Sequence, residues 1–190
     1  MTWRLSTRAA LLALALQVGA GGAALAHPLP GSELLLQQQT ADSLHLTIRF
    51  PLEDLLVAAP DLAALEKVAP EAPLSQEMID GLAAYLGQHL SVTEGDAPLP
   101  RALTGAHLQA THQDHLGDFT EVVTEWEFAN AGTDPASVVL QYDAVMHEVR
   151  NHRANVQWLA EGATPRVIEN FGFRRARRGI RLTLQETGQD

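Results

Sequence analysis

Apolar and polar residues alternate in two short stretches near the start of the folded part of the chain. Residues 43–50 (SLHLTIRF) place leucine, isoleucine and phenylalanine on one face and histidine, threonine and arginine on the other. This is the period of a half-buried strand. Residues 32–39 (SELLLQQQ) precede it across the turn 40–42. Together they predict a β-hairpin that ends at Pro51.

From residue 52 to about residue 90 the hydrophobic period becomes helical. Apolar residues recur at helical spacing around Leu65, and Pro70 and Pro73 then interrupt the pattern. Ser75 is a typical N-cap for a helix that runs to about Leu90 with one apolar stripe. We therefore expect a helical insertion after the second strand.

Strand patterns return after Pro100. They cover residues 101–113, 119–129, 138–149 and 152–159, and a last strand is expected within 179–186. With the first hairpin this makes about seven short strands, most of them joined as hairpins. The fold class expected is mostly β: an antiparallel β-sandwich with a helical insertion between strands 2 and 3. We expect one domain over residues 27–186, followed by a tail at 187–190.

The first 26 residues read as a cleaved signal peptide. Arg4 and Arg8 precede an apolar run at 9–18, and Ala24-Leu25-Ala26 fits the cleavage pattern. Cleavage between Ala26 and His27 predicts a bacterial periplasmic or secreted protein. The chain has no cysteine, which excludes a lipid-anchor thiol and disulfides.

Charge narrows the expected partners. The formal net charge is −10, and removal of Arg4 and Arg8 makes it more negative. An acidic protein disfavours nucleic acid and is compatible with cations. We expect no transmembrane segment in the mature chain. Five arginines cluster at residues 174–181; this cluster suits anions or a membrane surface, or serves as a solubilising segment.

The sequence contains eight histidines, and their imidazoles are its main candidate metal ligands. In the segment HEVRNHR (147–153), a two-residue hairpin turn at Arg150-Asn151 would bring His147 and His152 to one face, within reach of one metal ion. The alternative is a pair of core-edge histidines bonded to backbone or to neighbouring carboxylates such as Asp143. His112 and His115 (HQDH) form a weaker separate candidate, for which a solvated loop is the plainer interpretation.

Cleavage would give His27 a free α-amine beside its imidazole, and these two nitrogens can chelate one cation. Pro28 has no amide hydrogen, which excludes coordination through a deprotonated amide at that residue. With His147 or His152 the set would hold three nitrogens, which suits Cu(II) better than Ni(II) or Zn(II). The alternative is a terminus without a fixed position.

Two stretches together resemble a known family. These are AHPLPGSELLL (26–36) and LQYDAVMHEVRNHRANVQW (140–158). They are similar to the extracytoplasmic N-terminal domain of HupE/UreJ-like bacterial membrane proteins. The resemblance rests on an opening His-Pro-x-Pro and a later Tyr-Asp-x-x-x-His with a second histidine five positions on. It loosely implies nickel or other metal handling. Family members commonly continue into membrane helices, so this chain is expected to be a stand-alone relative or a shortened product.

The function expected is therefore an exported metal-binding domain, a copper or nickel carrier or sensor. Its expected ligands are His27, His147 and His152, with Tyr142 or Asp143 as axial or supporting groups. We expect a Cu, Ni or Zn ion and no organic cofactor, no enzymatic activity, and a membrane protein or metallochaperone as partner. The alternatives are a metal-free interaction or structural domain that docks a membrane partner, and a copper oxidase with an N-terminal histidine brace.

Overall fold

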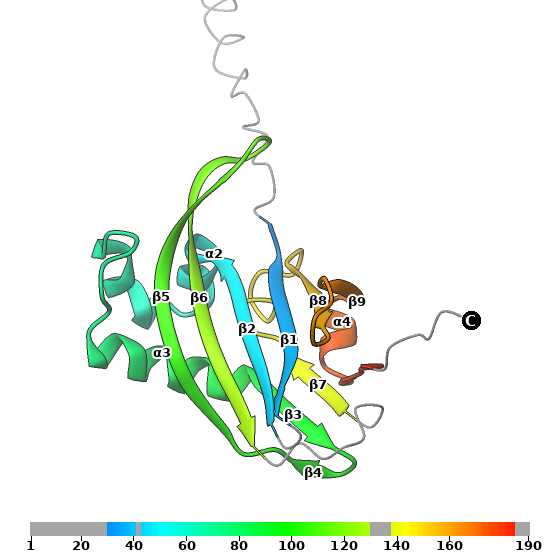
Figure 1. Ribbon diagram of the computed structural model, residues 1–190. Coiled ribbons are helices and arrows are strands. Elements are labelled where there is room, and N and C mark those ends of the chain that lie inside the picture. Colours follow the sequence, from blue (N-terminus) through cyan, green and yellow to red (C-terminus); the bar gives the residue numbers. More distant parts are fainter. Residues whose placement is uncertain (1–29, 41–42, 130–137, 185–190) are drawn as a thin grey trace, which may run out of the picture.

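The computed structural model describes residues 30–40, 43–129 and 138–184, and within them two sheets (Figure 1). A six-stranded sheet has the order β5-β6-β2-β1-β8-β9, and a four-stranded sheet has the order β10-β7-β3-β4. In chain order the elements are β1 (Ser32–Thr40), β2 (Ser43–Pro51), α2 (Leu52–Ala58), η1 (Pro60–Lys67), α3 (Gln76–His89), β3 (Leu90–Glu94), β4 (Ala97–Pro98), β5 (Arg101–Gln113), β6 (Gly117–Ala129), β7 (Val138–Tyr142), β8 (Arg153–Leu159), β9 (Arg166–Gly172), α4 (Phe173–Ala176) and β10 (Ile180–Arg181).

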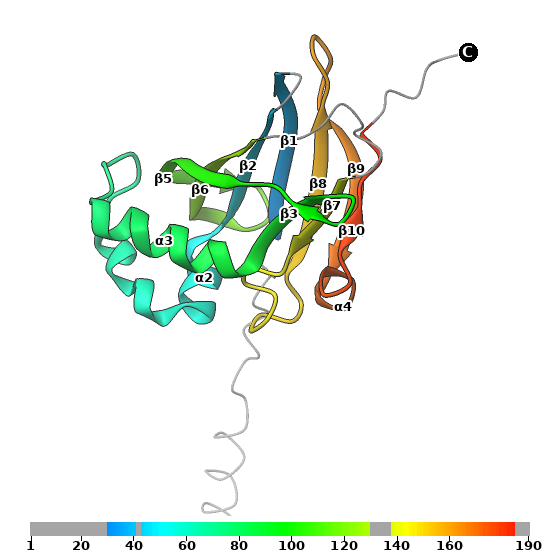
Figure 2. The same cartoon turned by 90° about the horizontal axis from the view of Figure 1, so that it is seen from below.

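One face of the six-stranded sheet forms most of the core. Leu34 in β1 lies opposite Ile48 in β2 and Val156 in β8, and all three are fully buried. The four-stranded sheet and α3 cover this face (Figures 1 and 2). Burying each such aliphatic side chain contributes about 1.5–3 kcal/mol. The alternation seen in the sequence thus separates a buried face from a more exposed one.

The mostly-β fold with a helical insertion is confirmed. The predicted first hairpin corresponds to β1 and β2, and β5 spans Arg101–Gln113 as expected. The insertion lies between β2 and β3, where Ser75 Oγ accepts a hydrogen bond from the Met78 amide and begins α3. Leu82 and Leu86 form the buried stripe of that helix.

Three details differ from the expected sandwich. The described residues contain ten strands rather than about seven; β3, β4 and β9 were not predicted. The sheets are not wholly antiparallel, because β1 pairs with β8 in parallel. The helix α3 runs directly into β3 at Leu90 without an intervening loop.

The prediction of a hairpin turn at Arg150-Asn151 is wrong. The strand predicted over 138–149 ends at Tyr142, and β7 and β8 belong to different sheets. Tyr142 instead pairs with Leu90 in β3. Residues 143–152, called the crossing loop below, carry the chain from one sheet to the other. Strand propensity alone does not show which sheet an adjacent strand joins.

The entry into β1 leads to a prediction. A Cβ on Gly31 would lie 2.1 Å from the carbonyl oxygen of Arg153, so alanine there must push β1 away from β8. We expect Gly31→Ala to lower the free energy of unfolding by about 3 kcal/mol. Gly87→Ala in α3 is the control, because a Cβ on Gly87 would meet nothing nearer than Arg101 Nη2 at 3.8 Å. This substitution should raise stability by up to about 1 kcal/mol. Urea unfolding measures both, and equal effects would contradict the close approach.

Candidate functional site

His152 lies at the end of the crossing loop, and both of its ring nitrogens are hydrogen-bonded. Nε2 is 2.8 Å from Ser32 Oγ, and Nδ1 is 2.8 Å from Asp54 Oδ2. Because the carboxylate accepts, Nδ1 carries the hydrogen and neutral Nε2 accepts from the serine. The residue is only 4% exposed. A metal ion at His152 would therefore have to displace one of these two partners.

Ser32 extends this contact into a buried network. Its Oγ also lies 2.6 Å from the hydroxyl of Tyr142. The chain Tyr142–Ser32–His152–Asp54 thus joins β7, β1, the crossing loop and α2. It has the order of a Ser-His-Asp triad, but Ser32 is 1% exposed. A substrate has no direct approach to that hydroxyl, and we assign the network a structural role.

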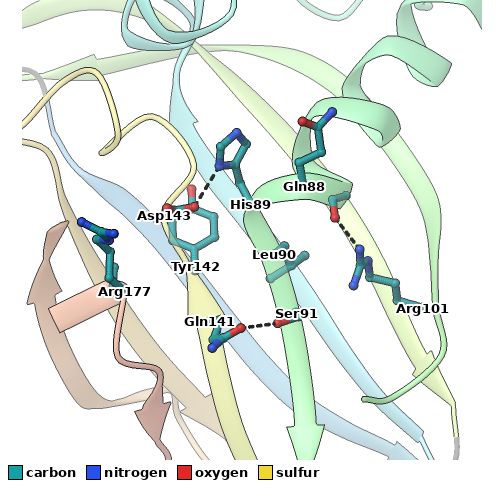
Figure 3. Close-up of a pocket in the computed structure, with 11 residues that line it drawn as sticks. Gln88, His89, Leu90, Ser91, Arg101, Gln141, Tyr142, Asp143 and Arg177 are labelled. Carbon is teal, nitrogen blue, oxygen red and sulfur yellow. Dashed lines mark hydrogen bonds and ion pairs between the residues drawn. The ribbon is translucent and has the colours of Figure 1, made fainter. Parts of the chain in front are cut away.

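The other end of the crossing loop is attached to the last residue of α3. Asp143 donates its amide hydrogen to the carbonyl oxygen of His89 at 3.1 Å, and its Oδ1 accepts from His89 Nδ1 at 2.8 Å. Figure 3 shows the hydrogen bond between the two side chains, which joins the end of β7 to the end of α3. Two contacts between the same two residues fix the direction of the His89 ring.

His147 stacks on His89. The ring centroids are 4.2 Å apart and the rings are parallel to within 9°. His147 Nδ1 lies 3.4 Å from the backbone oxygen of Asp143. A carbonyl oxygen only accepts, so this Nδ1 carries the hydrogen, as it does in His89. In the neutral rings both Nε2 atoms then hold a lone pair, and neither has a hydrogen-bond partner within the described ranges.

The backbone of the crossing loop is strained beside this pair. Val145 has φ 65°, a conformation that is rare for a β-branched residue. Its amide donates to the hydroxyl of Tyr85 at 2.8 Å. Tyr85 is one helical turn before His89, and their rings are 4.8 Å apart. Burial raises the pKa of Tyr85 to about 12, and the charges of Asp143 and Glu148 act in the same direction.

Two clefts open beside the histidine pair. The first has a volume of about 640 Å³. Residues of α2, η1 and α3 line it, among them Tyr85 and His89 of α3, and His147 of the crossing loop completes the lining. A second of about 300 Å³ is lined by His89 and Asp143 and extends between Arg101 and Arg177 (Figure 3). His89 lines both clefts, and the open nitrogens therefore belong to residues that solutes can approach.

The two predicted ligands that the structure describes, His147 and His152, are not brought together. His27 lies outside the described residues. His147 packs against His89, whereas His152 bonds to Ser32 and Asp54. Among the residues that the structure describes, no group of three or more His, Cys, Asp or Glu side chains is arranged to hold a metal ion.

The weaker candidates lie elsewhere. His112 and His115 are exposed at the β5–β6 connection, where His112 Nδ1 is 2.7 Å from Asp118 Oδ1. Of the expected supporting groups, Asp143 does orient a histidine, His89, and Tyr142 belongs to the buried network. Burial raises the pKa of Tyr142 well above its ordinary value.

His89 was not among the site residues expected from the sequence. The available signal was Tyr85 four residues earlier, because residues i and i+4 lie on the same helix face. An aromatic residue and a histidine at that spacing mark a face that contacts another element. Nothing in the local sequence indicated that this element would be the crossing loop.

Comparison with known proteins gives no assignment. The chain matches no family model and no curated protein. No helix within the described ranges has the length and apolarity needed to cross a membrane. The function must therefore be argued from the side chains themselves.

The buried network predicts a large effect for a small change. Ser32→Ala leaves His152 Nε2 and the Tyr142 hydroxyl without their partner in a dry environment. At about 1–3 kcal/mol for each unsatisfied group, we expect a loss of about 2–4 kcal/mol in the free energy of unfolding. Ser91→Ala, which removes an exposed bond to Gln141, should cost less than about 1 kcal/mol. Similar losses for both variants in urea unfolding would contradict a structural role for Ser32.

The two tyrosines of the chain predict an alkaline transition. Folded Tyr85 has a raised pKa of about 12, whereas the unfolded side chain ionises near 10.0. Stability from the neutral phenol is thus complete below pH 10 and is lost as the pH rises towards 12. Phenolate absorbance, followed with near-UV circular dichroism, should stay low through pH 10 in folded protein. Protein unfolded in guanidinium should titrate near 10; a folded protein that does the same would contradict the burial of both rings.

Proposed function

We propose that this protein is an extracytoplasmic metal-binding domain whose site is built on Nε2 of His89 and Nε2 of His147. The observation that carries the proposal is the arrangement of the pair. Each ring has its Nδ1 bonded to Asp143, and each neutral Nε2 carries a lone pair beside a cleft. The stacked rings direct these two lone pairs side by side, so the His147 ring, which has the longer and weaker Nδ1 contact, must turn for both nitrogens to reach one ion.

The partners of the two Nδ1 atoms support this function. Histidines that bind metals almost always donate their other N–H to a carboxylate or a backbone carbonyl, which fixes the tautomer and orients the ring. Asp143 supplies both kinds of acceptor, its carboxylate to His89 and its carbonyl to His147. The pair therefore has its supporting hydrogen bonds before any metal binds.

The electrostatic surroundings also favour a cation. His89 is the last residue of α3, where the helix dipole places partial negative charge. Asp143 adds a carboxylate 2.8 Å from the His89 ring. The overall charge of −10 adds a weaker attraction.

Two imidazoles are an incomplete ligand set, so other groups must complete it. Water can fill open positions, and His27 would supply an amine and an imidazole if the chain is cut before it. The five residue-to-residue steps from His27 to Ser32 span at most roughly 17 Å. Nitrogen ligands suit Cu(II), Ni(II) and Zn(II), with Cu(II) highest in affinity order.

The periplasmic or secreted location is part of the proposal. It rests on the signal-peptide pattern of residues 1–26 and on the absence of cysteine from the sequence. A carrier or sensor in that compartment would exchange its ion with a membrane protein or a metallochaperone. The open cleft beside His147 suits such exchange because the ion need not cross the core.

Calorimetric titration of protein that begins at His27 tests the site. We expect at least one of Cu(II), Ni(II) and Zn(II) to bind with a Kd below about 10 μM. His147→Ala and His89→Ala should each weaken binding about tenfold or more, a change of about 1.4 kcal/mol. His45→Ala is the matched control, since His45 lies in β2 and lines neither cleft beside the pair, and it should leave binding unchanged.

Each other result has a defined meaning. Failure of all three metals to bind would overturn the proposal and favour a metal-free domain that docks a membrane partner. Binding that survives both His89 and His147 substitutions would place the site elsewhere. A form with one extra alanine before His27 tests the α-amine: unchanged affinity for this form excludes the amine as a ligand, while the histidine pair still stands.

A further inference from the structure

A cationic cleft lies on the side of the crossing loop that carries Arg150. It has a volume of about 670 Å³ and is lined by Arg150, Arg153, Gly172, Phe173, Arg174 and Arg175. Four of its six lining residues are arginines, and none is acidic. The whole chain has a formal charge of −10, so this cleft is positively charged in a protein whose net charge is negative.

The fold brings these arginines together from three elements. Arg150 belongs to the crossing loop, and Arg153 is the first residue of β8. Arg153 lies opposite Gly172, the last residue of β9. The helix α4 starts at the next residue, Phe173, and supplies Arg174 and Arg175 (Figure 2). Two arginines of the C-terminal cluster, Arg174 and Arg175, thus share a cleft with Arg150 and Arg153, which precede them by more than twenty residues.

Most of the positive charge in the cleft is not neutralised. Arg175 makes two hydrogen bonds to the carboxylate of Glu169, at 2.9 and 2.7 Å. Arg153 bonds through Nε and Nη2 to Asn170, which is neutral. Arg150 and Arg174 have no carboxylate partner among the described residues. Three guanidinium groups therefore keep their charge without an acidic neighbour in the cleft.

Phe173 holds part of this charge in a fixed geometry. The guanidinium carbon of Arg150 lies 3.9 Å from the centre of its ring, and that of Arg177 lies 5.8 Å away. Phe173 packs against the core. A guanidinium stacked on a ring keeps its N–H groups free at the edges, where they can form paired bonds to an oxyanion.

We propose that this cleft is a binding site for a phosphate group. Planar guanidinium groups match the oxygen spacing of phosphate and bind it through paired, charge-assisted hydrogen bonds. Arg150 and Arg174 carry the interaction, and Arg153 supplies further charge beside them. A phosphate group can come from a free phosphate or from the headgroup of an anionic lipid, and both share this recognition chemistry.

Two binding measurements distinguish these sources. The first is calorimetric titration with inorganic phosphate, and the second is co-sedimentation with vesicles of equimolar phosphatidylcholine and phosphatidylglycerol. We expect binding to at least one, which weakens as salt is raised because the contacts are charge-dependent. Arg174→Gln should weaken that binding about tenfold, and the double variant Arg150→Gln/Arg174→Gln should weaken it further.

Arg49→Gln is the matched control, because Arg49 is an exposed arginine in β2 outside the cleft. It removes the same charge and should leave binding within about twofold of the wild type. Arg174 is exposed and makes no hydrogen bond or ion pair with the described residues, so its variant should keep the wild-type Tm. Absence of binding to both probes, or equal losses in Arg174→Gln and Arg49→Gln, would overturn the proposal. Metal affinity at the histidine pair should not change in either variant.

Discussion

The two hydrogen bonds of Ser32, to Tyr142 and to His152, form the buried polar contact that joins the two sheets and the crossing loop. Ser32 begins β1 in the six-stranded sheet and also bonds Tyr142 at the end of β7 in the four-stranded sheet. His152 in turn donates a hydrogen bond from Nδ1 to Asp54 near the start of α2. Such groups are expensive to bury unpaired, so the network favours the one packing in which all of them are satisfied.

That network also holds one end of the crossing loop, and the loop in turn positions His147. The loop is bonded at one end through Asp143 to His89 and at the other through His152 to Ser32 and Asp54. Between these points Tyr85 supports the strained backbone of Val145. A loop held in this way keeps His147 stacked on His89 without using either open nitrogen. The buried hydrogen bonds thus belong to His152, whereas the open ring nitrogens belong to His89 and His147.

The same loop separates two surfaces of opposite character. His147 lines the cleft beside α3, whereas Arg150, three residues later, lines the arginine cleft beside α4. One surface offers imidazole nitrogens near a carboxylate, and the other offers guanidinium groups near a phenyl ring. Short loops that carry function on a rigid scaffold are common, and here the scaffold consists of both sheets.

The sequence by itself determined the strands with one apolar face, the helical insertion and the Ser75 cap, because these follow from local period and local hydrogen bonding. It also singled out His147. It failed at the crossing loop, since whether residues 138–159 form a hairpin or pass between sheets depends on distant partners in β1, β3 and α2. Only the tertiary structure decided that His152 is a buried hydrogen-bonding residue and that His147 pairs with His89. Ring-nitrogen partners 54 to 120 residues away leave no local pattern.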